Sequence, residues 1–506
     1  MRKVHPLFLE LKEHSKEIHT YGSILGLLHW DLETYIPPGG VNARSCQIAQ
    51  LSKLVHEEKT SKRFKSRLEK LIYLTTGTPK IKDLTKQELI CLREWRKSFL
   101  RDTKLPTSFV EELSQVASQA TQIWAIAKKE SNFKLFAPFL QKIVDLNRKK
   151  ADLYKFSDHP YDALLECFEP CMTTQRIGTI FGNLASELTV LLKKIVKADP
   201  IDDRFLHKIV SDTKQLEIGR SLLAKLPADP TYSRLDLSNH PFSMGIHPHD
   251  SRITTRIIPK KFMSNIFSVL HEAGHMMYDM GLPCEHWGTP LAEPISVSIH
   301  ESQSRWWETL IGRNLPFWRY YYPILQEEYA PLKKISLDTF YRAINKVTPS
   351  CIRVEADEVT YCLHIILRFE IEKQLIAGSL PVSEVPEFWN SKMYELLGVK
   401  PRSDAEGCLQ DIHWSLGEFG YFPTYALGNL FAAHFFSAFA IANKDWDQKI
   451  ASGDLVFVRE WLKKNIHHWG RTYDSEELAK KVTKTALSTD AYCTYLKKKY
   501  ASIYDF

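Results

Sequence analysis

The sequence lacks the marks of a secreted or membrane-spanning protein. Its first apolar run, residues 7–9, is interrupted by charge within three residues, so no signal-peptide core is expected. The most apolar later stretch, residues 426–442, contains Asn429, His434 and Ser437 and is shorter than the roughly 20 residues that span a bilayer. We therefore expect a buried core helix there and no membrane partner.

Cysteine is present without the pattern of a disulfide framework. The nine cysteines are odd in number and widely scattered: Cys46, Cys91, Cys167, Cys171, Cys284, Cys351, Cys362, Cys408 and Cys493. This pattern favours reduced thiols and a cytoplasmic location. Cys167 and Cys171 could share a helix face, but no second pair lies nearby, so no structural metal site is expected there.

No block of charge of one sign stands out. The formal net charge of +7 is modest for 506 residues. The Lys-rich segments 59–70 and 497–499 have the pattern of solvated helix faces. Nucleic-acid binding is therefore not expected.

Repeats, low-complexity tracts and linkers are also missing. The content of 44% hydrophobic and 25% charged residues is that of an ordinary globular protein. Helical periodicity covers most of the chain, whereas turn formers and β-branched residues in 227–259 favour a short sheet. We expect one large, mostly α domain over residues 1–506, with N-terminal helices of roughly 1–110 forming a lid or subdomain.

The strongest chemical signal is the pentapeptide His271-Glu272-Ala273-Gly274-His275. On an α-helix, a spacing of four places both imidazoles on one face, where they can bind one Zn²⁺. Glu272 lies beside that position and can take a proton from a water molecule that the metal activates. A buried helix with two hydrogen-bonded core histidines is the alternative. The helical pattern and the apolar neighbours on both sides favour a zinc hydrolase.

A catalytic zinc needs a third protein ligand from another element. Residues 298–308 are helical in pattern and lie about 26 residues beyond His275, which suits a second helix packed antiparallel to the first. Glu301 is the better ligand candidate there. His300 is more plausible as a hydrogen-bonded neighbour, and Glu308, two turns on, as a supporting partner of a ligand.

Several segments together resemble the signature set of the thermostable (Taq-type) metallocarboxypeptidases, peptidase family M32, in both order and spacing. Six segments carry this resemblance: residues 240–242, 250–254, 271–275, 300–303, 352–358 and 407–414. Residues 30–31, 37–40 and 161–165 add to it, so the likeness covers almost the whole chain. Three positions depart from the family pattern without touching a proposed ligand: Cys171, where Gly is commoner, Cys362 and His434.

The resemblance implies a cytoplasmic, metal-dependent carboxypeptidase that is usually a homodimer. It also implies an almost all-helical, gluzincin-like fold with a deep groove. The matched positions imply these roles: metal binding by His271, His275 and Glu301, general base catalysis by Glu272, binding of the substrate carboxylate by Arg353, and lining of the primed side of the cleft by His413 with Tyr421 or Tyr425.

The chemistry of these residues is consistent with such roles. An enzyme that acts at a C-terminus must bind a free carboxylate, and the planar fork of Arg suits that task. Arg353 stands among acidic residues, however, so a structural salt bridge is the alternative. Asp357 is expected to support the site rather than to catalyse. A hydroxyl of Tyr421 or Tyr425 could donate to the oxyanion, or these rings could simply pack.

The expected reaction is hydrolysis of the last peptide bond of a peptide with a free C-terminus. Zinc would lower the pKa of its water toward ~7, and Glu272 would take that proton and pass it to the leaving amine. Ligation by two nitrogens and an oxygen also accepts Co²⁺ or Mn²⁺. Two rivals are an endopeptidase or oligopeptidase on the same scaffold and a non-catalytic helical binding protein.

Overall fold

The computed structural model describes residues 4–506; Met1 to Lys3, the start of the predicted domain, lie outside the described residues. Helices dominate, as the periodicity predicted. The helices of the first half are α1 (Pro6–Thr34), α2 (Val41–Thr60), α3 (Lys62–Leu71), α4 (Lys86–Asp102), α5 (Thr107–Glu130), α6 (Phe133–Tyr154), α7 (Pro160–Leu165), α8 (Thr174–Ile195) and α9 (Asp212–Lys225).

The second half carries the proposed metal-binding helices. Its helices are α10 (Phe262–Gly281), α11 (Val297–Arg305), α12 (Leu315–Glu328), α13 (Leu337–Ile344), α14 (Tyr361–Ala377), α15 (Val385–Leu397), α16 (His413–Leu416), α17 (Phe422–Ala442), α18 (Trp446–Ala451), α19 (Val456–Asn465), α20 (Ser475–Thr483) and α21 (Asp490–Tyr504). A π-helical turn, Trp306–Ile311, continues α11.

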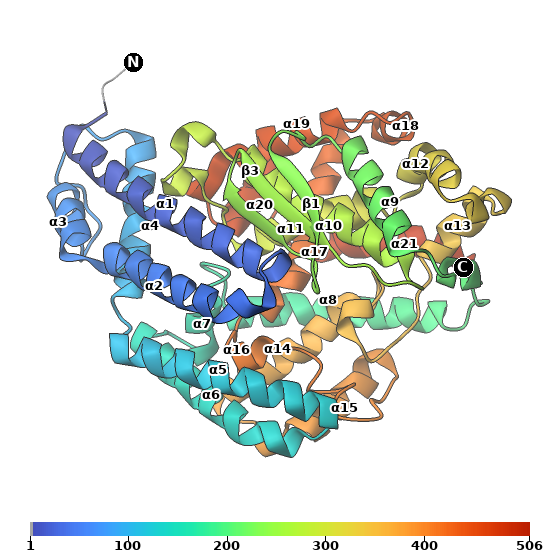
Figure 1. Cartoon of the computed structure of the whole chain (residues 1–506), viewed down its shortest axis with the longest axis horizontal. Coiled ribbons are helices and arrows are strands. Elements are labelled where there is room, and N and C mark those ends of the chain that lie inside the picture. Colours follow the sequence, from blue (N-terminus) through green and yellow to red (C-terminus); the bar gives the residue numbers. More distant parts are fainter. Residues whose placement is uncertain (1–3) are drawn as a thin grey trace.

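The predicted short sheet is present between α9 and α10. It consists of β1 (Ser233–Leu237), β2 (Ser243–His247) and β3 (Asp250–Thr255) in the order β1-β3-β2. β1 pairs with β3 in parallel and β2 pairs with β3 antiparallel. α10 packs against β2 and β3, and the N-terminal helix α1 contacts β2 (Figure 1). The sheet therefore supports the helix that carries His271 and His275.

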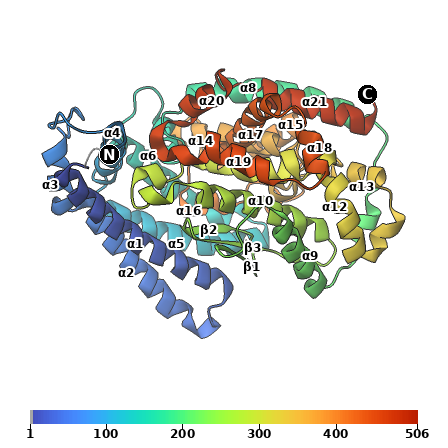
Figure 2. The same cartoon turned by 90° about the horizontal axis from the view of Figure 1, so that it is seen from above.

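Within residues 4–506, buried hydrophobic residues form two separate clusters. The larger one extends from Ala120 to Tyr504 and includes most of α10 and α17. The smaller one is built by α1, α3 and α4, with Leu291 as its member from the main body. Figure 1 shows these N-terminal helices gathered at one end of the molecule, and Figure 2 shows α1 and α2 extending side by side away from the body.

Helix boundaries follow local capping chemistry. Ser61 and Thr173 accept a hydrogen bond from the backbone N–H three residues on, and Thr85 forms a reciprocal capping box with Glu88. Cys171, a departure from the family pattern, has a φ of 69°, a left-handed conformation that favours glycine.

Two sequence predictions need correction. The apolar run predicted as 426–442 is part of a longer helix, α17, which is long and apolar enough to cross a membrane by length and composition. Most of its apolar window is buried inside the protein, so it is a core helix, as expected. Lys499 is not on a solvated face: it is 8% exposed and its Nζ lies 2.6 Å from Glu358 Oε2.

Candidate active site

The histidine pair lies in the middle of α10, on the face turned toward α11. The imidazoles of His271 and His275 are 5.0 Å apart, centroid to centroid. The close approach of the two helices depends on Gly274, where a Cβ atom would lie 2.4 Å from the carbonyl oxygen of Gln303 on α11. The helical spacing and this glycine together place the two rings against the next helix.

Glu301 on α11 lies opposite both histidines. Its Oε2 atom is 3.6 Å from His271 Nε2 and 3.4 Å from His275 Nε2. The three residues each offer one ligand atom, and these atoms lie within 4.8 Å of one another. The carboxylate is 4% exposed. Such a set of two imidazoles and one carboxylate fits a divalent cation and leaves a coordination position open.

The outer ring nitrogens of both histidines have their own partners. His271 Nδ1 lies 2.8 Å from Glu308 Oε2. Because a carboxylate only accepts, the proton of a neutral His271 is held on Nδ1 and the Nε2 lone pair faces Glu301. This is the arrangement that a metal-ligating histidine requires.

A chain of two hydrogen bonds, through His300 to Asp279, favours the same tautomer of His275, with the proton on Nδ1. Its Nδ1 lies 2.6 Å from His300 Nδ1, and His300 Nε2 lies 2.9 Å from Asp279 Oδ1. If His300 donates from Nε2 to Asp279, its Nδ1 accepts from His275, which leaves the Nε2 lone pair of His275 facing Glu301. His300 and Glu308 thus lie beside the candidate ligands and are not among them.

Burial and neighbouring charges shift the pKa values of this cluster. Burial alone would lower the pKa of His271, but Glu301 and Glu308 outweigh it and raise that pKa to about 9. Burial lowers the pKa of His275 to about 4. Burial would raise the pKa of Glu301, yet His271 and Arg305 hold it well below its usual range. Glu301 is therefore an anion, as a metal ligand must be.

Glu272 stands apart from these ion pairs. It is 6% exposed, and burial raises the pKa of its carboxyl to about 7. A carboxyl group with a pKa near neutrality can both accept and return a proton at physiological pH. Its side chain lines the cleft beside the two histidines.

A cleft of about 800 Å³ leads to this cluster. Its inner end is lined by His271, Glu272, His275 and Glu301, together with Tyr421 and Tyr425 from the start of α17. Its outer walls come from α4 of the N-terminal helices and from the segment that leads into the first turn of α20. These outer lining residues include Arg93, Lys97, Arg101, Arg471, Asp474 and Glu477.

Arg353 and His413 do not line this cleft but lie behind its aromatic wall. The Arg353 guanidinium is 5.2 Å from the centre of the Tyr425 ring, and His413 Nε2 is 3.2 Å from the Tyr425 hydroxyl. Two nitrogens of Arg353, Nε and Nη2, also donate to the same oxygen of Asp411, Oδ1, at 2.9 and 2.7 Å. The salt bridge that was the alternative for Arg353 is thus present.

Asp411 also accepts a hydrogen bond from a second arginine, Arg368. Its Oδ2 accepts from Arg368 Nε at 2.6 Å, and Arg368 is fully buried. Two guanidinium groups thus share one carboxylate, which leaves one positive charge in excess. An excess charge in a buried position is costly unless another anion balances it.

Asp357 takes no part in the site, contrary to its predicted supporting role. Its carboxylate accepts from the backbone N–H groups of Thr348, Val359 and Thr360 at 2.9–3.0 Å. It therefore organises the loop before α14. An aspartate that begins a helical turn commonly binds backbone amides in this way.

Two residues beside the candidate ligands had no predicted role. Arg305 donates to Glu301 Oε1 at 2.8 Å and to Glu308 Oε2 at 3.1 Å, and Asp279 binds His300. Helical spacing could have indicated both, since Arg305 follows Glu301 by four residues and Asp279 follows His275 by four.

The absence of a side chain at Gly428 on α17 leaves the space that the Glu301 side chain occupies. A Cβ atom at this position would lie 2.4 Å from Glu301 Cγ. We expect Gly428→Ala to lower the free energy of unfolding by about 1–3 kcal/mol through overpacking, and to displace Glu301. Urea denaturation measures the first effect and metal content the second.

Gly182→Ala is the matched control for that change. Gly182 is an exposed residue within α8, and a Cβ atom there would have nothing within 4 Å. We expect it to gain about 0.4–1 kcal/mol because alanine restricts the unfolded chain. If Gly428→Ala behaved like Gly182→Ala, the close contact with Glu301 would be absent in solution.

Comparison with known proteins agrees with this geometry. The family model for carboxypeptidase Taq (M32) metallopeptidases matches residues 10–500. Thermostable carboxypeptidase 1 of Thermus thermophilus is 38% identical over 98% of this chain and 99% of its own length, and carboxypeptidase 1 of Bacillus subtilis is 35% identical over 99% of both. The crystal structure of the M32 carboxypeptidase from Deinococcus radiodurans R1 superposes with a TM-score of 0.95 at 32% identity, covering 99% of this chain and all of that one. The chain therefore belongs to the carboxypeptidase Taq (M32) family of metallopeptidases and is a metal-dependent carboxypeptidase.

Proposed function

We propose that this carboxypeptidase releases single residues from peptides with a free C-terminus, with His271, His275 and Glu301 holding one Zn²⁺ and Glu272 acting as the general base. The observation that carries the proposal is the convergence of three ligand atoms within 4.8 Å at the inner end of a cleft, beside a buried glutamate. The chain of hydrogen bonds through His300 and the contact with Glu308 support it, because both free the inner nitrogens for a cation.

Zinc is the metal that this donor set favours, although Co²⁺ and Mn²⁺ accept the same ligands. When bound, the cation would supply Lewis acidity and a lowered pKa for a water molecule at the open position. The chain itself contributes the fixed tautomers of both histidines and the negative charge of Glu301.

Glu272 moves the proton in this scheme. It accepts a proton from the attacking water and returns it to the amine that leaves. A hydroxyl of Tyr421 or Tyr425 donates to the oxygen of the scissile carbonyl as that oxygen becomes negative. Burial raises the pKa of both tyrosines, so both keep the proton that a donor needs.

Arg353 is the proposed partner of the substrate's terminal carboxylate. Arg353 and Arg368 share the single carboxylate of Asp411, so an arriving carboxylate would balance the remaining positive charge. The ring of Tyr425 stands between Arg353 and the cleft, which makes a shift of Tyr425 part of substrate binding in this proposal. His413, which contacts Tyr425, would line the same primed side.

A panel of N-blocked dipeptides and tripeptides tests the function. Each is offered with a free or an amidated C-terminus, with and without chelator. Release of the last residue from free peptides alone, and its loss with chelator, is the expected result. Internal cleavage of amidated peptides at comparable rates would favour the endopeptidase alternative. Metal analysis of the purified protein identifies the ion.

Arg353→Ala is expected to reduce kcat/KM for free peptides by about 10²-fold or more, because a charge-assisted bidentate contact is lost. Steady-state kinetics measure this effect. Arg402→Ala, which changes an exposed arginine, is the control for the buried Arg353. A near-normal kcat/KM for Arg353→Ala would assign Arg353 to the salt bridge alone.

The N-terminal helices, roughly residues 1–110, would act as a lid within one domain. Arg93 on α4 supports this proposal, because its Nη2 donates across the outer cleft to the carbonyl oxygens of Arg471 and Thr472 at 3.1 and 3.0 Å.

The nine free cysteines support a cytoplasmic location.

A homodimer is also part of the proposal. No residue of the 20-residue helix α2 is buried within the chain, and its apolar Leu54 is 37% exposed. We expect sedimentation velocity to give twice the chain mass of 58.6 kDa, and Leu54→Glu to shift the protein toward the monomer. A single species at the chain mass would contradict the dimer.

A further inference from the structure

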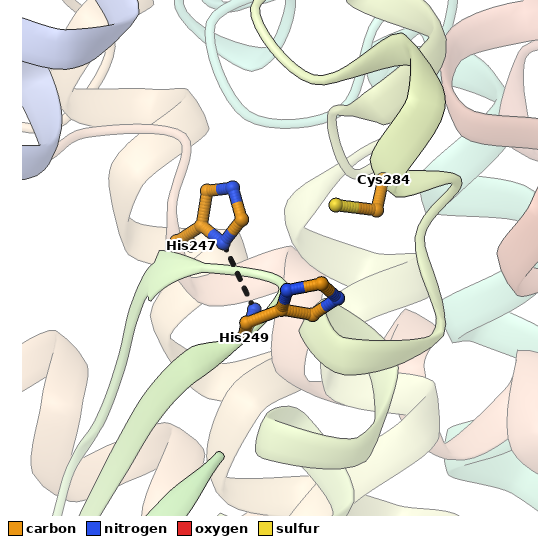
Figure 3. A group of neighbouring side chains, drawn as sticks. All are labelled: His247, His249 and Cys284. Atoms are coloured by element: carbon orange, nitrogen blue, oxygen red, sulfur yellow. Dashed lines mark hydrogen bonds between the residues drawn. The ribbon is translucent and has the colours of Figure 1, made fainter.

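We propose a second zinc site, formed by His247, His249 and Cys284 at the end of α10 away from the catalytic cluster's ligands. The three side chains each offer one ligand atom, and these atoms lie within 4.8 Å of one another, as in the catalytic cluster. Figure 3 shows the Cys284 sulfur pointing toward the two imidazoles. This group is separate from the cleft, whose lining contains none of the three.

Two chain segments bring these ligands together. β2 ends at His247 and β3 begins at Asp250, so His247 and His249 flank Pro248 in the tight turn between two paired strands. Cys284 begins the 3-10 turn Cys284–His286, just after α10 ends at Gly281. The fixed φ of Pro248 and the strand pairing restrict the turn, which lowers the entropy that metal binding must overcome.

Both imidazoles are already oriented by aromatic neighbours. The ring of His249 stacks on Tyr232 with centroids 4.4 Å apart and an interplanar angle of 17°. The ring of His247 lies 5.0 Å from Trp287, which follows Cys284 by three residues. Side chains that are held in place before a ligand arrives bind it more tightly than mobile ones.

One hydrogen bond changes when the site fills. His247 Nδ1 accepts from the backbone N–H of His249 at 3.0 Å, in an exposed position. A neutral imidazole has a single lone pair on one nitrogen, so coordination through Nε2 moves the proton to Nδ1. Water then takes the place of Nδ1 as acceptor for the His249 N–H. Cys284 loses its thiol proton to solvent as the zinc–sulfur bond forms.

The donor set selects the class of metal. Two imidazoles and one thiolate suit Zn²⁺, or Co²⁺ in its place, with water as the fourth ligand. Hard cations such as Ca²⁺ and Mg²⁺ prefer oxygen donors. The catalytic cluster has no sulfur donor, so a cobalt–sulfur band distinguishes the two sites.

Zinc at this position would fasten the β2–β3 turn to the end of α10. The same strand already approaches α10 closely at Gly245, where a Cβ atom would lie 2.4 Å from Asp279 Oδ2. The role is therefore structural, and turnover with a loaded catalytic site should not require it.

Metal stoichiometry and the spectrum of the cobalt-substituted protein test the proposal. The full-length wild type should bind two Zn²⁺ per chain by native mass spectrometry, and the cobalt form should show a near-ultraviolet sulfur-to-metal band. Cys284→Ser and His249→Ala should each bind one ion and lose the band while keeping kcat. Cys46→Ser, which removes an exposed thiol on α2, should keep two ions and the band.

The double variant His271→Ala/His275→Ala separates this proposal from the catalytic one. It should lose one ion and all activity but retain the sulfur band. A wild type that binds a single ion without a sulfur band would overturn the second site. So would a Cys284→Ser variant that keeps two ions, since the second ion would then lie elsewhere.

Discussion

Glu272→Gln is expected to lower kcat by about 10⁴-fold while the metal content stays that of the wild type. The amide has nearly the shape of the carboxyl but cannot accept a proton from water, and general base catalysis contributes about 10²–10⁴-fold to a rate. Glu272 makes no hydrogen bond to His271, His275 or Glu301 in the described part of the chain, so the ligand set is left intact. Single-turnover assays and metal analysis measure the two effects.

The control for this change is Glu395→Gln, on the exposed face of α15. Glu395 pairs with Lys392 at 2.7 Å on the surface, where such pairs contribute little. It should keep full kcat. A Glu272→Gln variant that kept its metal and retained near-normal kcat would show that another group takes the proton. If it lost the metal instead, the carboxyl of Glu272 would belong to the ligand set.

Glu301→Gln is expected to weaken metal affinity by more than about 100-fold and to abolish activity at low metal concentration. The change removes the one negative charge placed 3.4–3.6 Å from both imidazole Nε2 atoms. It also gives Arg305, which is mostly buried, a neutral amide in place of one of its two carboxylate partners, Glu301 and Glu308. Competition with a chelator of known affinity measures the first effect, and a titration of activity with metal measures the second.

Thermal unfolding offers an independent measurement for the same variant. Metal at about 100 times its Kd stabilises a folded chain by about 2.7 kcal/mol, so the wild type should gain Tm on addition of zinc at the catalytic site. Glu301→Gln should lose most of that gain. The measurement is made in the Cys284→Ser background, so that the proposed second site does not contribute.

Glu308→Gln provides a graded comparison. Glu308 contacts His271 through Nδ1 and is not itself within the ligand group. Loss of such an outer contact typically costs about 10–100-fold in metal affinity, less than loss of a ligand. Equal effects of Glu301→Gln and Glu308→Gln would mean that Glu301 is no closer to the metal than Glu308 is.

Local periodicity allowed most helices to be predicted, because helix formation depends on residues three and four apart in the sequence. It also placed the small sheet correctly, since turn formers and β-branched residues are local signals. The apolar stretch 426–442 falls short of the start of α17, because the first helical residues, Phe422 to Tyr425, include a proline and directly follow the glycines Gly417 and Gly420. The burial of Lys499 could not be predicted, since its partner Glu358 lies 141 residues away.

The amino-acid sequence by itself determined how the first two candidate ligands are placed. A spacing of four on one helix fixes His271 and His275 side by side whatever the rest of the chain does. Glu301 was inferred from its position in a second helix and from the family resemblance. That its carboxylate faces both Nε2 atoms is a result of the packing of α11 between α10 and α17, at Gly274 and Gly428.

Only the tertiary structure decided which distant groups meet. It paired Arg353 with Asp411 and placed both behind Tyr425, and it directed Asp357 to backbone amides instead of the site. It also brought His247, His249 and Cys284 together, three residues with no motif in common. The physical reason is the same in each case. Contacts between helices and strands depend on how their whole faces pack together, and this packing cannot be read from the spacing of residues along the chain.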